Sequence, residues 1–597
     1  MAAATEGGAR WTRRRVLHLL SAAGAAVVAA PGLGAEGGGV SDEAIAAAAE
    51  LLGLELTGEE RALMREGLAE LRDSYETLRQ VALANEVPPA LTFDPRPAGH
   101  SRPLASGPSR VALAAAPPPA RPRDETDLAF LPVHRLARLV RSRQVSSREL
   151  TRLYLDRISR LDPLLHAVIA VTEERALTEA DRADRELAAG VWRGPLHGIP
   201  WGAKDLLAAE GYPTTWGATP FREQVIPMDA TVVQRLQAAG AVLVAKLTLG
   251  ELAWGDVWFG GKTANPWNLE QGSSGSSAGP AAATAAAMVG FAIGSETWGS
   301  IVSPSARCGV TGLRPTFGRV SRHGAMALSW SMDKIGPLAR TVEDCALAFG
   351  AIHGADGHDP TVLDVPFRWP PDRPPGELRV GFVEALFDEP LEPDDRQAGE
   401  QRGLDLATLD ELRRQGFELV PVTLPELPVG TLSLILTAEA AAAFDELTRS
   451  GRDELLVRQV EQAWPNVFRQ GRLIPAVEYL QANRVRTLVM RRMNQLFEEV
   501  DAYVAPSFAG QDLLLTNLTG HPAVVLPNGF RSDGTPGSIT FTGGLFGEGE
   551  LLALARRYQE ATGFHLRRPA IDATGQADCD RGIRGGGRTG VRRQARP

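Results

Sequence analysis

Lysine is rare in this chain and confined to one stretch of it. Among 63 basic residues only four are lysines, at positions 204, 246, 262 and 334, and the rest are arginines. Arginine keeps its proton in proteins, whereas a buried lysine can lose its proton and act as a base. A single lysine is more often a packing residue or half of an ion pair. The residues around Lys204 therefore have to decide its role.

Two loops of glycine and serine lie downstream of Lys204, at either end of an alanine-rich segment. The first, residues 272–280, contains Ser276, and the second, residues 294–301, contains Ser300. Such loops are usually flexible connections or turns. However, backbone N–H groups in a tight glycine-containing turn can converge on a developing oxyanion. Two such loops with a rare lysine upstream favour serine-based nucleophilic catalysis.

Two other serine chemistries fit short stretches of the sequence. Residues 275–279 match G-x-S-x-G, which would make Ser277 the nucleophile of a strand–turn–helix elbow. That elbow needs a strand directly before it, and residues 265–271 are a poor strand candidate. Ser331 and Lys334 match S-x-x-K, but Gly336-Pro337 follows and would break the helix that this motif requires. We therefore discount both motifs.

Several longer segments carry a resemblance to a known family. They are Gly198 to Asp205, Ser276 to Gly279, Gly294 to Ser300, Cys308 to Ser321, Gly336 to Asp344 and Asn517 to Ala523. In these segments, and in their order, the chain resembles the amidase signature family over nearly all of residues 124–568. The resemblance implies an α/β fold with a large mixed β-sheet sandwiched between helical layers.

The resemblance also implies a mechanism without metal or cofactor. Lys204 would be the neutral base, and Ser276, after a cis peptide bond, would relay a proton from Ser300. Ser300 would form the acyl-enzyme, with the N–H groups of Thr297, Trp298, Gly299 and Ser300 as the oxyanion hole. The family's separation of 24 residues between the two serines selects Ser276 rather than Ser273 or Ser274.

The chain departs from the family pattern beside the predicted nucleophile. Trp298 stands where glycine is common, Glu296 where aspartate is common, and Val302 where arginine is usual. A carboxylate–arginine pair is therefore expected to be missing, and the shape of the acyl pocket is open. Residues 385–500 match poorly, so the resemblance does not name the substrate.

The N-terminal region predicts targeting followed by a helical hairpin. Residues 1–35 contain Thr12-Arg13-Arg14-Arg15 before an apolar stretch too short for a membrane span, as in a twin-arginine export signal. We therefore expect an exported protein. Residues 41–92 predict a helical hairpin, in which Thr57 and Glu60 form a capping box. Residues 93–123, rich in Pro, Ala and Arg, predict a linker or surface strap.

From residue 124 to about 568 the pattern alternates between helices and strands. Residues 241–245, 378–383 and 523–526 predict buried strands. Residues 147–161 and 485–500 predict amphipathic helices. Residues 569–597 are rich in Gly and Arg with few large apolar groups, so we expect a disordered tail.

The bulk composition limits the partners. The net charge of −9 argues against nucleic-acid binding, which needs a basic surface. Three cysteines, at 308, 345 and 579, predict no disulfide framework, and no metal-ligand spacing is present. We expect a small-molecule amide as substrate and no stable membrane span, while the oligomeric state is left open.

The sequence therefore predicts an amidohydrolase that cleaves an amide-type C–N bond. A carbamate or ester hydrolase on the same site is an alternative. Another is the amidase subunit of a tRNA-dependent amidotransferase, against which the export signal argues. A catalytically silent binding protein on the same fold is also possible, but retention of Lys204, Ser276 and Ser300 weighs against it.

Overall fold

The computed structural model describes residues 40–80, 85, 87, 91–100, 104–114, 116–390, 392 and 395–571. The predicted export signal, Cys579 and nearly all of the predicted tail lie outside these residues. The chain divides into two compact units, Met1–Leu83 and Ala84–Pro597. Within the described residues, no helix has the length and apolar character needed to cross a bilayer.

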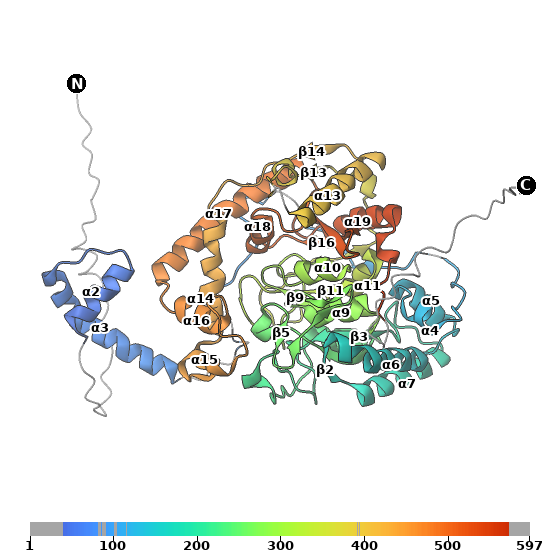
Figure 1. Cartoon of the computed structure of the whole chain (residues 1–597), viewed down its shortest axis with the longest axis horizontal. Helices are drawn as coiled ribbons and strands as arrows, with labels where there is room; N and C mark the ends of the chain where they lie inside the picture. The colour runs from blue at the N-terminus through green and yellow to red at the C-terminus, as the bar shows by residue number, and fades with distance from the viewer. Residues whose placement is uncertain are drawn as a thin grey trace, which may run out of the picture. The chain divides into compact units, whose positions relative to one another are not determined.

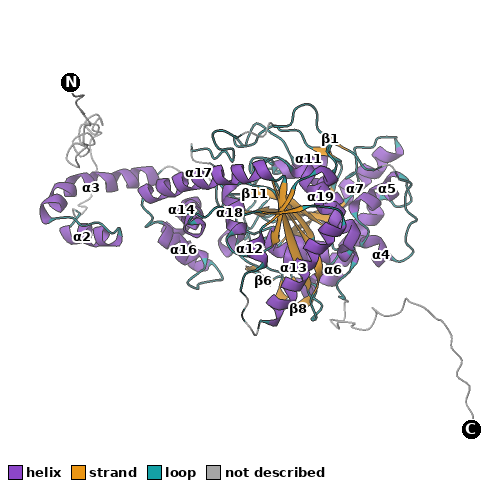
Figure 2. Ribbon diagram, turned by 90° about the horizontal axis from the view of Figure 1, so that it is seen from above, coloured by secondary structure: helices purple, strands orange, loops and turns teal. Residues whose placement is uncertain are grey.

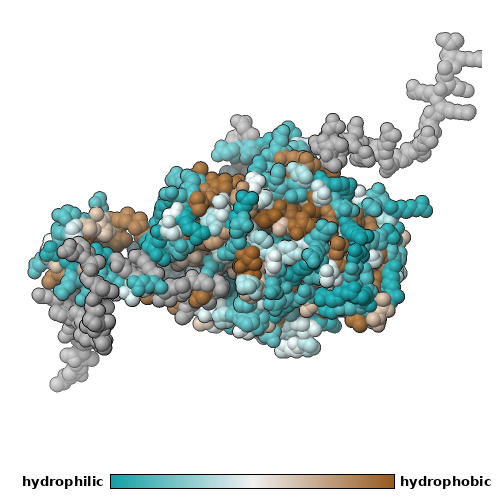
Figure 3. Space-filling model, turned by 90° about the horizontal axis from the view of Figure 1, so that it is seen from below, coloured by the Kyte–Doolittle hydropathy of each residue, from teal (hydrophilic) through white to brown (hydrophobic). Residues whose placement is uncertain are grey.

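The described part of the first unit consists of two helices, α2 (Asp42–Leu51) and α3 (Gly58–Arg79). Ser41 caps α2 by accepting the Ala44 N–H, and Thr57 with Glu60 forms the capping box of α3. An ion pair of 3.0 Å between Arg61 and Asp42 joins the two helices. Several leucines of this hairpin remain exposed (Figure 3), namely Leu51, Leu52, Leu54, Leu63, Leu71 and Leu78.

An eleven-stranded mixed sheet forms the centre of the second unit (Figures 1 and 2). Strand β3 runs parallel to its neighbours β4 and β9, whereas β9 runs antiparallel to β11. Helices surround the strands, which confirms the predicted α/β architecture. In spatial order the strands are β14 (Leu419–Pro421), β13 (Val380–Phe382), β15 (Ala502–Pro506), β17 (Pro536–Gly543), β16 (Ala523–Phe530), β10 (Thr311–Arg314), β11 (Lys334–Ala339), β9 (Phe291–Glu296), β3 (Pro200–Lys204), β4 (Val242–Leu247) and β2 (Val168–Val171).

The two faces of the sheet carry separate cores because successive side chains of a strand point to opposite faces. On β4, Leu243 belongs to one apolar cluster, and Val242 and Val244 belong to another. Helices α11 (Val342–Ile352) and α19 (Glu548–Thr562) contribute to the first cluster, and α9 (Ala278–Ala285) contributes to the second. Small residues let α9 lie close to the sheet.

The remaining elements complete the layers and edges. The other helices are α4 (Glu125–Ala129), α5 (Val133–Arg141), α6 (Ser147–Leu165), α7 (Glu173–Ala188), α8 (Thr231–Ala238), α10 (Val302–Cys308), α12 (Glu384–Phe387), α13 (Arg396–Arg414), α14 (Leu434–Ala443), α15 (Asp445–Arg449), α16 (Trp464–Gly471), α17 (Ala476–Glu499) and α18 (Asp512–Thr519). Short strand pairs join β1 (Arg110–Val111) to β12 (Arg368–Trp369), β5 (Val257–Trp258) to β6 (Gly261–Lys262), and β7 (Ala264–Asn265) to β8 (Asn268–Gly272).

The strands expected from apolar runs are present as β4, β13 and β16, and the expected helices as α6 and α17. Helix α17 begins nine residues before its predicted start at Val485. In that extra part Val477 and Leu480 are more than half exposed. Ala482 is buried and Tyr479 packs against the same apolar cluster, but the exposed Val477 and Leu480 obscure the helical period in the sequence.

The segment predicted as a linker or strap is docked on the second unit. Strand β1 pairs in parallel with β12, and Pro95 and Pro97 are buried. The Phe93 ring lies under the guanidinium of Arg486, 3.6 Å from its carbon. These contacts hold parts of the segment against the rest of the second unit.

Candidate active site

One of the three predicted catalytic residues ends a strand of the main sheet, and the other two lie on loops. Lys204 is the last residue of β3, and Ser300 follows β9, its parallel neighbour. The carboxyl ends of parallel strands meet at one edge of a sheet, where side chains from different loops can converge. Ser276 lies on the loop that leads into α9. All three side chains are less than 10% exposed.

Lys204 is fully buried among hydroxyl groups. Its Nζ donates to Ser276 Oγ at 2.8 Å, to Ser295 Oγ at 3.0 Å and to Ser277 Oγ at 3.1 Å. Burial lowers the pKa of Lys204 to about 7, although the more distant charges of Asp333 and Glu296 oppose this shift. Near neutral pH a substantial fraction of this amine therefore carries no charge and can accept a proton.

The Ser276 loop contains a cis peptide bond and is hydrogen-bonded to the Ser300 loop. The Gly275–Ser276 peptide bond is cis, as the resemblance implied, and the Ser277 N–H donates to the Ser300 carbonyl at 3.1 Å. A side chain at position 275 would collide with the Gly255 carbonyl, because an added Cβ would lie 1.8 Å from that oxygen. Glycine is therefore required at position 275, where the backbone passes close to the backbone of Gly255.

The turn before Ser300 presents backbone N–H groups. Gly299 has φ +84°, a conformation that favours glycine. Within the described part of the chain, the N–H groups of Trp298, Gly299 and Ser300 donate no backbone hydrogen bond. Thr297 is held from the side, because its Oγ1 donates to Asp333 Oδ1 at 2.5 Å. The turn is thus fixed by neighbouring groups while these N–H groups stay available.

Glu296 anchors the same turn and corrects one expectation. Its Oε2 accepts the N–H groups of Ile301 and Val302 at 2.8 and 2.9 Å. Its Oε1 accepts Arg314 Nη1 and Asn517 Nδ2, both at 2.8 Å. Burial alone would raise the pKa of Glu296, but the charge and hydrogen bond of Arg314 bring it down to about 2.

The expected absence of a carboxylate–arginine pair was wrong. Arg314, on β10, forms this pair with Glu296, and both side chains are fully buried. Sequence reasoning missed Arg314 and Asn517 as partners of Glu296, although both lie in segments that carried the resemblance. Arg314 reaches Glu296 from strand β10, and Asn517 reaches it from helix α18.

The Ser277 alternative fails on burial. The prediction of a poor strand at residues 265–271 was wrong, because β8 forms there, but β8 pairs with β7 and not with the main sheet. Ser277 is fully buried. Its hydroxyl accepts from Lys204 and the Ser295 N–H and donates to the Ser295 carbonyl. It is therefore a structural partner of Lys204.

The S-x-x-K alternative also lacks its helix. Lys334 begins strand β11, and its Nζ donates to the Met332 carbonyl. Ser331 donates to Glu439 instead.

Cys308 and Cys345 are buried and free. Among the described residues, no three His, Cys, Asp or Glu side chains are placed to hold a metal ion.

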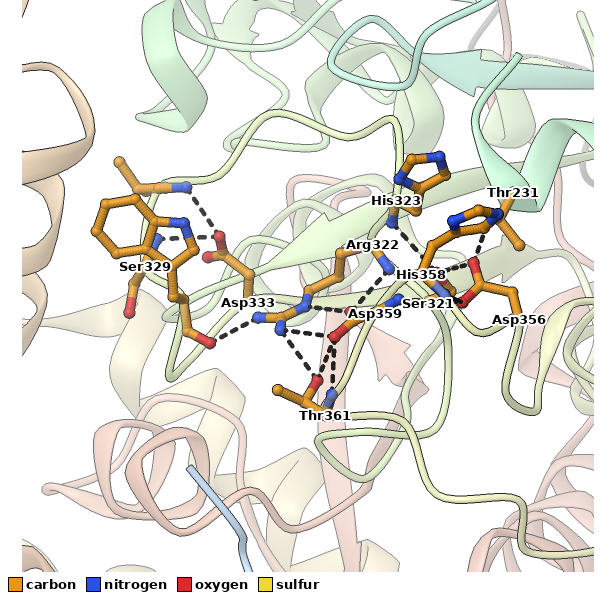
Figure 4. Close-up of polar contacts among 12 residues, drawn as sticks. Thr231, Ser321, Arg322, His323, Ser329, Asp333, Asp356, His358, Asp359 and Thr361 are labelled. Carbon is orange, nitrogen blue, oxygen red and sulfur yellow. Dashed lines mark hydrogen bonds and ion pairs between the residues drawn. The ribbon is translucent and has the colours of Figure 1, made fainter. Parts of the chain in front are cut away.

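A small cavity adjoins the predicted site on the side of Thr297 and Ser295. It measures about 70 Å³, and we call it the Thr297 cavity. Figure 4 shows the polar contacts around it, where Arg322 donates to both carboxylate oxygens of Asp359. The stacked rings of His323 and His358, with centroids 4.3 Å apart, also line it.

A larger cavity of about 410 Å³ is lined by the start of helix α10, which follows Ser300, and we call it the Ser303 cavity. Its lining includes Ser274, from the loop of the cis bond, and Ser303, one helical turn after Ser300. Two arginines, Arg307 and Arg531, and the carboxylate of Asp395 also contribute. The two cavities thus differ in size and in chemistry.

Comparison with known proteins places this site in a family. The sequence pattern of the Amidase family matches residues 149–552. Over 481 residues the chain is 37% identical to a glutamyl-tRNA(Gln) amidotransferase subunit from Methylococcus capsulatus, covering 73% of this chain and 98% of that protein. The corresponding subunit from Thermosynechococcus vestitus is 36% identical, covering 74% of this chain and 99% of that protein.

Solved structures show the same fold. The native peptide amidase of Stenotrophomonas maltophilia superposes with a TM-score of 0.63 at 30% identity, covering 75% of this chain and 98% of that one. A 6-aminohexanoate cyclic dimer hydrolase gives a TM-score of 0.64 at 25% identity, covering 74% of this chain and 99% of that one. This chain belongs to the amidase signature family and is an enzyme of the amidase type, acting on C–N bonds.

Proposed function

We propose that this enzyme hydrolyses an amide through an acyl-enzyme on Ser300. The observation that carries the proposal is the buried Lys204 amine, which lies 2.8 Å from Ser276 Oγ and forms no ion pair within the described residues. Its depressed pKa supplies a base near neutral pH. The N–H groups before Ser300 supply the electrophilic side of the same site.

The proposed reaction has two halves. Ser300 Oγ attacks the carbonyl carbon, its proton moves to Ser276 Oγ, and the Ser276 proton moves to Lys204 Nζ. The tetrahedral oxyanion is stabilised by the N–H groups of Trp298, Gly299 and Ser300, with Thr297 as the fourth proposed donor. The C–N bond then breaks as the proton returns through Ser276 to the leaving amine. A water molecule then attacks the acyl-enzyme, with proton transfer along the same path, and releases the carboxylic acid and free Ser300.

The experiment compares wild type with Ser300→Ala on a panel of amides, carbamates and esters. We expect amide turnover and labelling by a fluorophosphonate probe to disappear in Ser300→Ala, and chelators to leave the wild type unaffected. Turnover that survives in Ser300→Ala, or a wild type inactivated by chelators, would refute the proposal. Faster turnover of carbamates or esters than of all amides would reassign the substrate but not the nucleophile.

The names of the curated relatives favour a second candidate. In it, the chain is the amide-cleaving subunit of an aminoacyl-tRNA amidotransferase, in which the same Ser300 chemistry releases ammonia from an amide donor to a partner subunit. The distinction is measurable, because a stand-alone hydrolase turns over its amide when purified alone. An amidotransferase subunit should instead release ammonia from glutamine efficiently only when its partner subunits and charged tRNA are added.

We further propose that residues 1–35 direct export, as their arginine-rich and apolar parts suggest. Export would separate the enzyme from tRNA and so favour the hydrolase. The test is to fuse residues 1–35 to a reporter and to replace Arg13 and Arg14 by lysine. Export that is lost in the double variant supports this proposal, and a reporter that stays inside the cell contradicts it.

A further inference from the structure

The Thr297 cavity has an apolar interior. Five buried apolar side chains contribute to its wall: Leu206, Ala253, Met326, Leu328 and Ile335. The wall is also held in place, because Asn85 accepts the N–H of Ala327 at 2.6 Å and donates to its carbonyl at 2.9 Å. A ligand group that enters this cavity therefore contacts apolar side chains whose backbone is held in place by hydrogen bonds.

Arg322 and Asp333, two charged groups around this cavity, already have hydrogen-bond partners within the protein (Figure 4). Arg322 donates to both oxygens of Asp359, to the Trp330 carbonyl and to Thr361 Oγ1. Asp333 accepts Thr297 Oγ1 and the N–H groups of Leu328 and Ser329. The hydrogen-bonding positions of both side chains are taken up within the protein, so neither offers a free hydrogen-bonding position to replace the hydration that a charged ligand group would lose.

The cavity reaches the proposed reaction centre at one end. Ser295, whose Oγ accepts from Lys204 at 3.0 Å, and Thr297, beside the proposed oxyanion hole, both line it. His358 and Pro360 line it as well and are exposed to solvent. The space therefore extends from the surface to the residues around Lys204.

The Ser303 cavity has the opposite character. It is about 410 Å³ against about 70 Å³, and Arg307 stands exposed in its wall. Hydrolysis of an acyl-enzyme requires water to enter where the amine has left, whereas the acyl group must stay in place through both halves of the reaction. The larger polar cavity suits the amine and water, and the smaller apolar cavity suits the acyl group.

We infer that the Thr297 cavity binds the acyl side of the substrate, and that the enzyme prefers amides of short, uncharged carboxylic acids. This inference rests on the proposed acyl-enzyme at Ser300. Dry cavities of about 150 Å³ bind benzene, so a space of about 70 Å³ fits an acyl chain of three or four carbons. The same logic disfavours an acyl group that carries a carboxylate or an ammonium.

The experiment measures kcat/KM for acetamide, propionamide, butyramide, hexanamide and succinamate. We expect a rise of about fourfold per added methylene up to butyramide, from the transfer free energy of a buried methylene, and a fall at hexanamide. Succinamate, in which a carboxylate replaces the terminal methyl group of butyramide, should be at least about 100-fold poorer than butyramide. A preference for succinamate or glutamine would overturn the inference.

Two variants should move the preferred length in opposite directions. Ala327→Leu narrows the cavity and should make acetamide the best substrate, whereas Met326→Ala widens it and should favour hexanamide. The matched control is Ala398→Leu in the Ser303 cavity, which should leave the acyl-length preference unchanged. If both variants fold and keep the wild-type ranking, the inference is wrong.

The outcome separates this inference from the proposed function. If wild type is labelled on Ser300 and hydrolyses amides, but acyl length and charge do not matter, only the inference about the Thr297 cavity fails. If no amide is hydrolysed and Ser300 is not labelled, the proposed function fails with it.

Discussion

Lys204 and Lys246 occupy adjacent strands at almost the same level, and both are fully buried. Lys246 on β4 lies opposite Ala203 on β3, so the two lysines point to opposite faces of the sheet. Asp205 follows Lys204 in sequence but pairs with Lys246, its Oδ1 lying 2.6 Å from Nζ. Within the described residues, Lys204 is left with three serine hydroxyls and the Ser295 carbonyl.

The difference shows that burial does not by itself make a base. A buried lysine beside a carboxylate has its charge compensated, whereas one among uncharged groups bears the desolvation cost uncompensated and its pKa falls. For Lys204 the fall reaches about 7. The alternation of side chains along β3 thus separates Lys204 from the carboxylate next to it in the chain.

The largest effect is expected from removal of the proposed base. Lys204→Met should lower kcat/KM by about 1,000-fold or more, within the range for loss of a general base. Lys204→Arg should be equally inactive, because arginine cannot give up its proton. A Lys204→Arg enzyme that retained a tenth of wild-type kcat/KM would refute the assignment. Unfolding in urea should show both variants to be folded.

The same substitution at Lys246 should lower the stability of the fold rather than remove a catalytic group. Lys246→Met leaves the Asp205 carboxylate buried without its cation, which costs about 3 to 5 kcal/mol in free energy of unfolding. Urea denaturation measures the loss. The double variant Lys246→Met/Asp205→Asn should recover part of it because no unpaired charge remains. A single variant as stable as wild type would mean that Asp205 finds compensation elsewhere.

Substitutions of Ser276 and Ser277, which both contact Lys204, should differ in their effect on kcat. Ser276→Ala should reduce kcat by about 100-fold, since it interrupts the proposed proton path. Ser277→Ala should cost less than about tenfold, because its hydroxyl only supports Lys204 and Ser295. Steady-state kinetics on the folded variants checks the order, and a larger loss in Ser277→Ala would transfer the relay to that residue.

The smallest effect concerns pH. Protonated Lys204 cannot accept a proton, so kcat/KM for an uncharged amide should rise with pH through about 7 and reach a plateau above it. The Asp333 carboxylate raises the pKa of Lys204, so Asp333→Asn should move the rising limb to lower pH. The residual activity of Lys204→Met should no longer show this rise in kcat/KM with pH. If the rise is unchanged in that variant, a group other than Lys204 is responsible for it.

The sequence alone determined the features that depend on local chemistry. The scarcity of lysine and the two glycine–serine loops pointed to serine chemistry, and the resemblance carried by these segments named Lys204, Ser276 and Ser300 as the proposed catalytic residues. The capping box of Thr57 and Glu60 is equally local, because its hydrogen bonds span three residues. Apolar runs predicted β4, β13 and β16 for the same reason.

Only the tertiary structure decided which charges meet. That Arg314 and Asn517 both reach Glu296 depends on pairing and packing between segments 18 and 221 residues apart. That Asp205 serves Lys246 and not Lys204 depends on the register of β3 against β4. The Thr297 and Ser303 cavities are also lined by residues far apart in sequence. Electrostatic energies and cavity shapes are set by distances in space, which local sequence patterns do not fix.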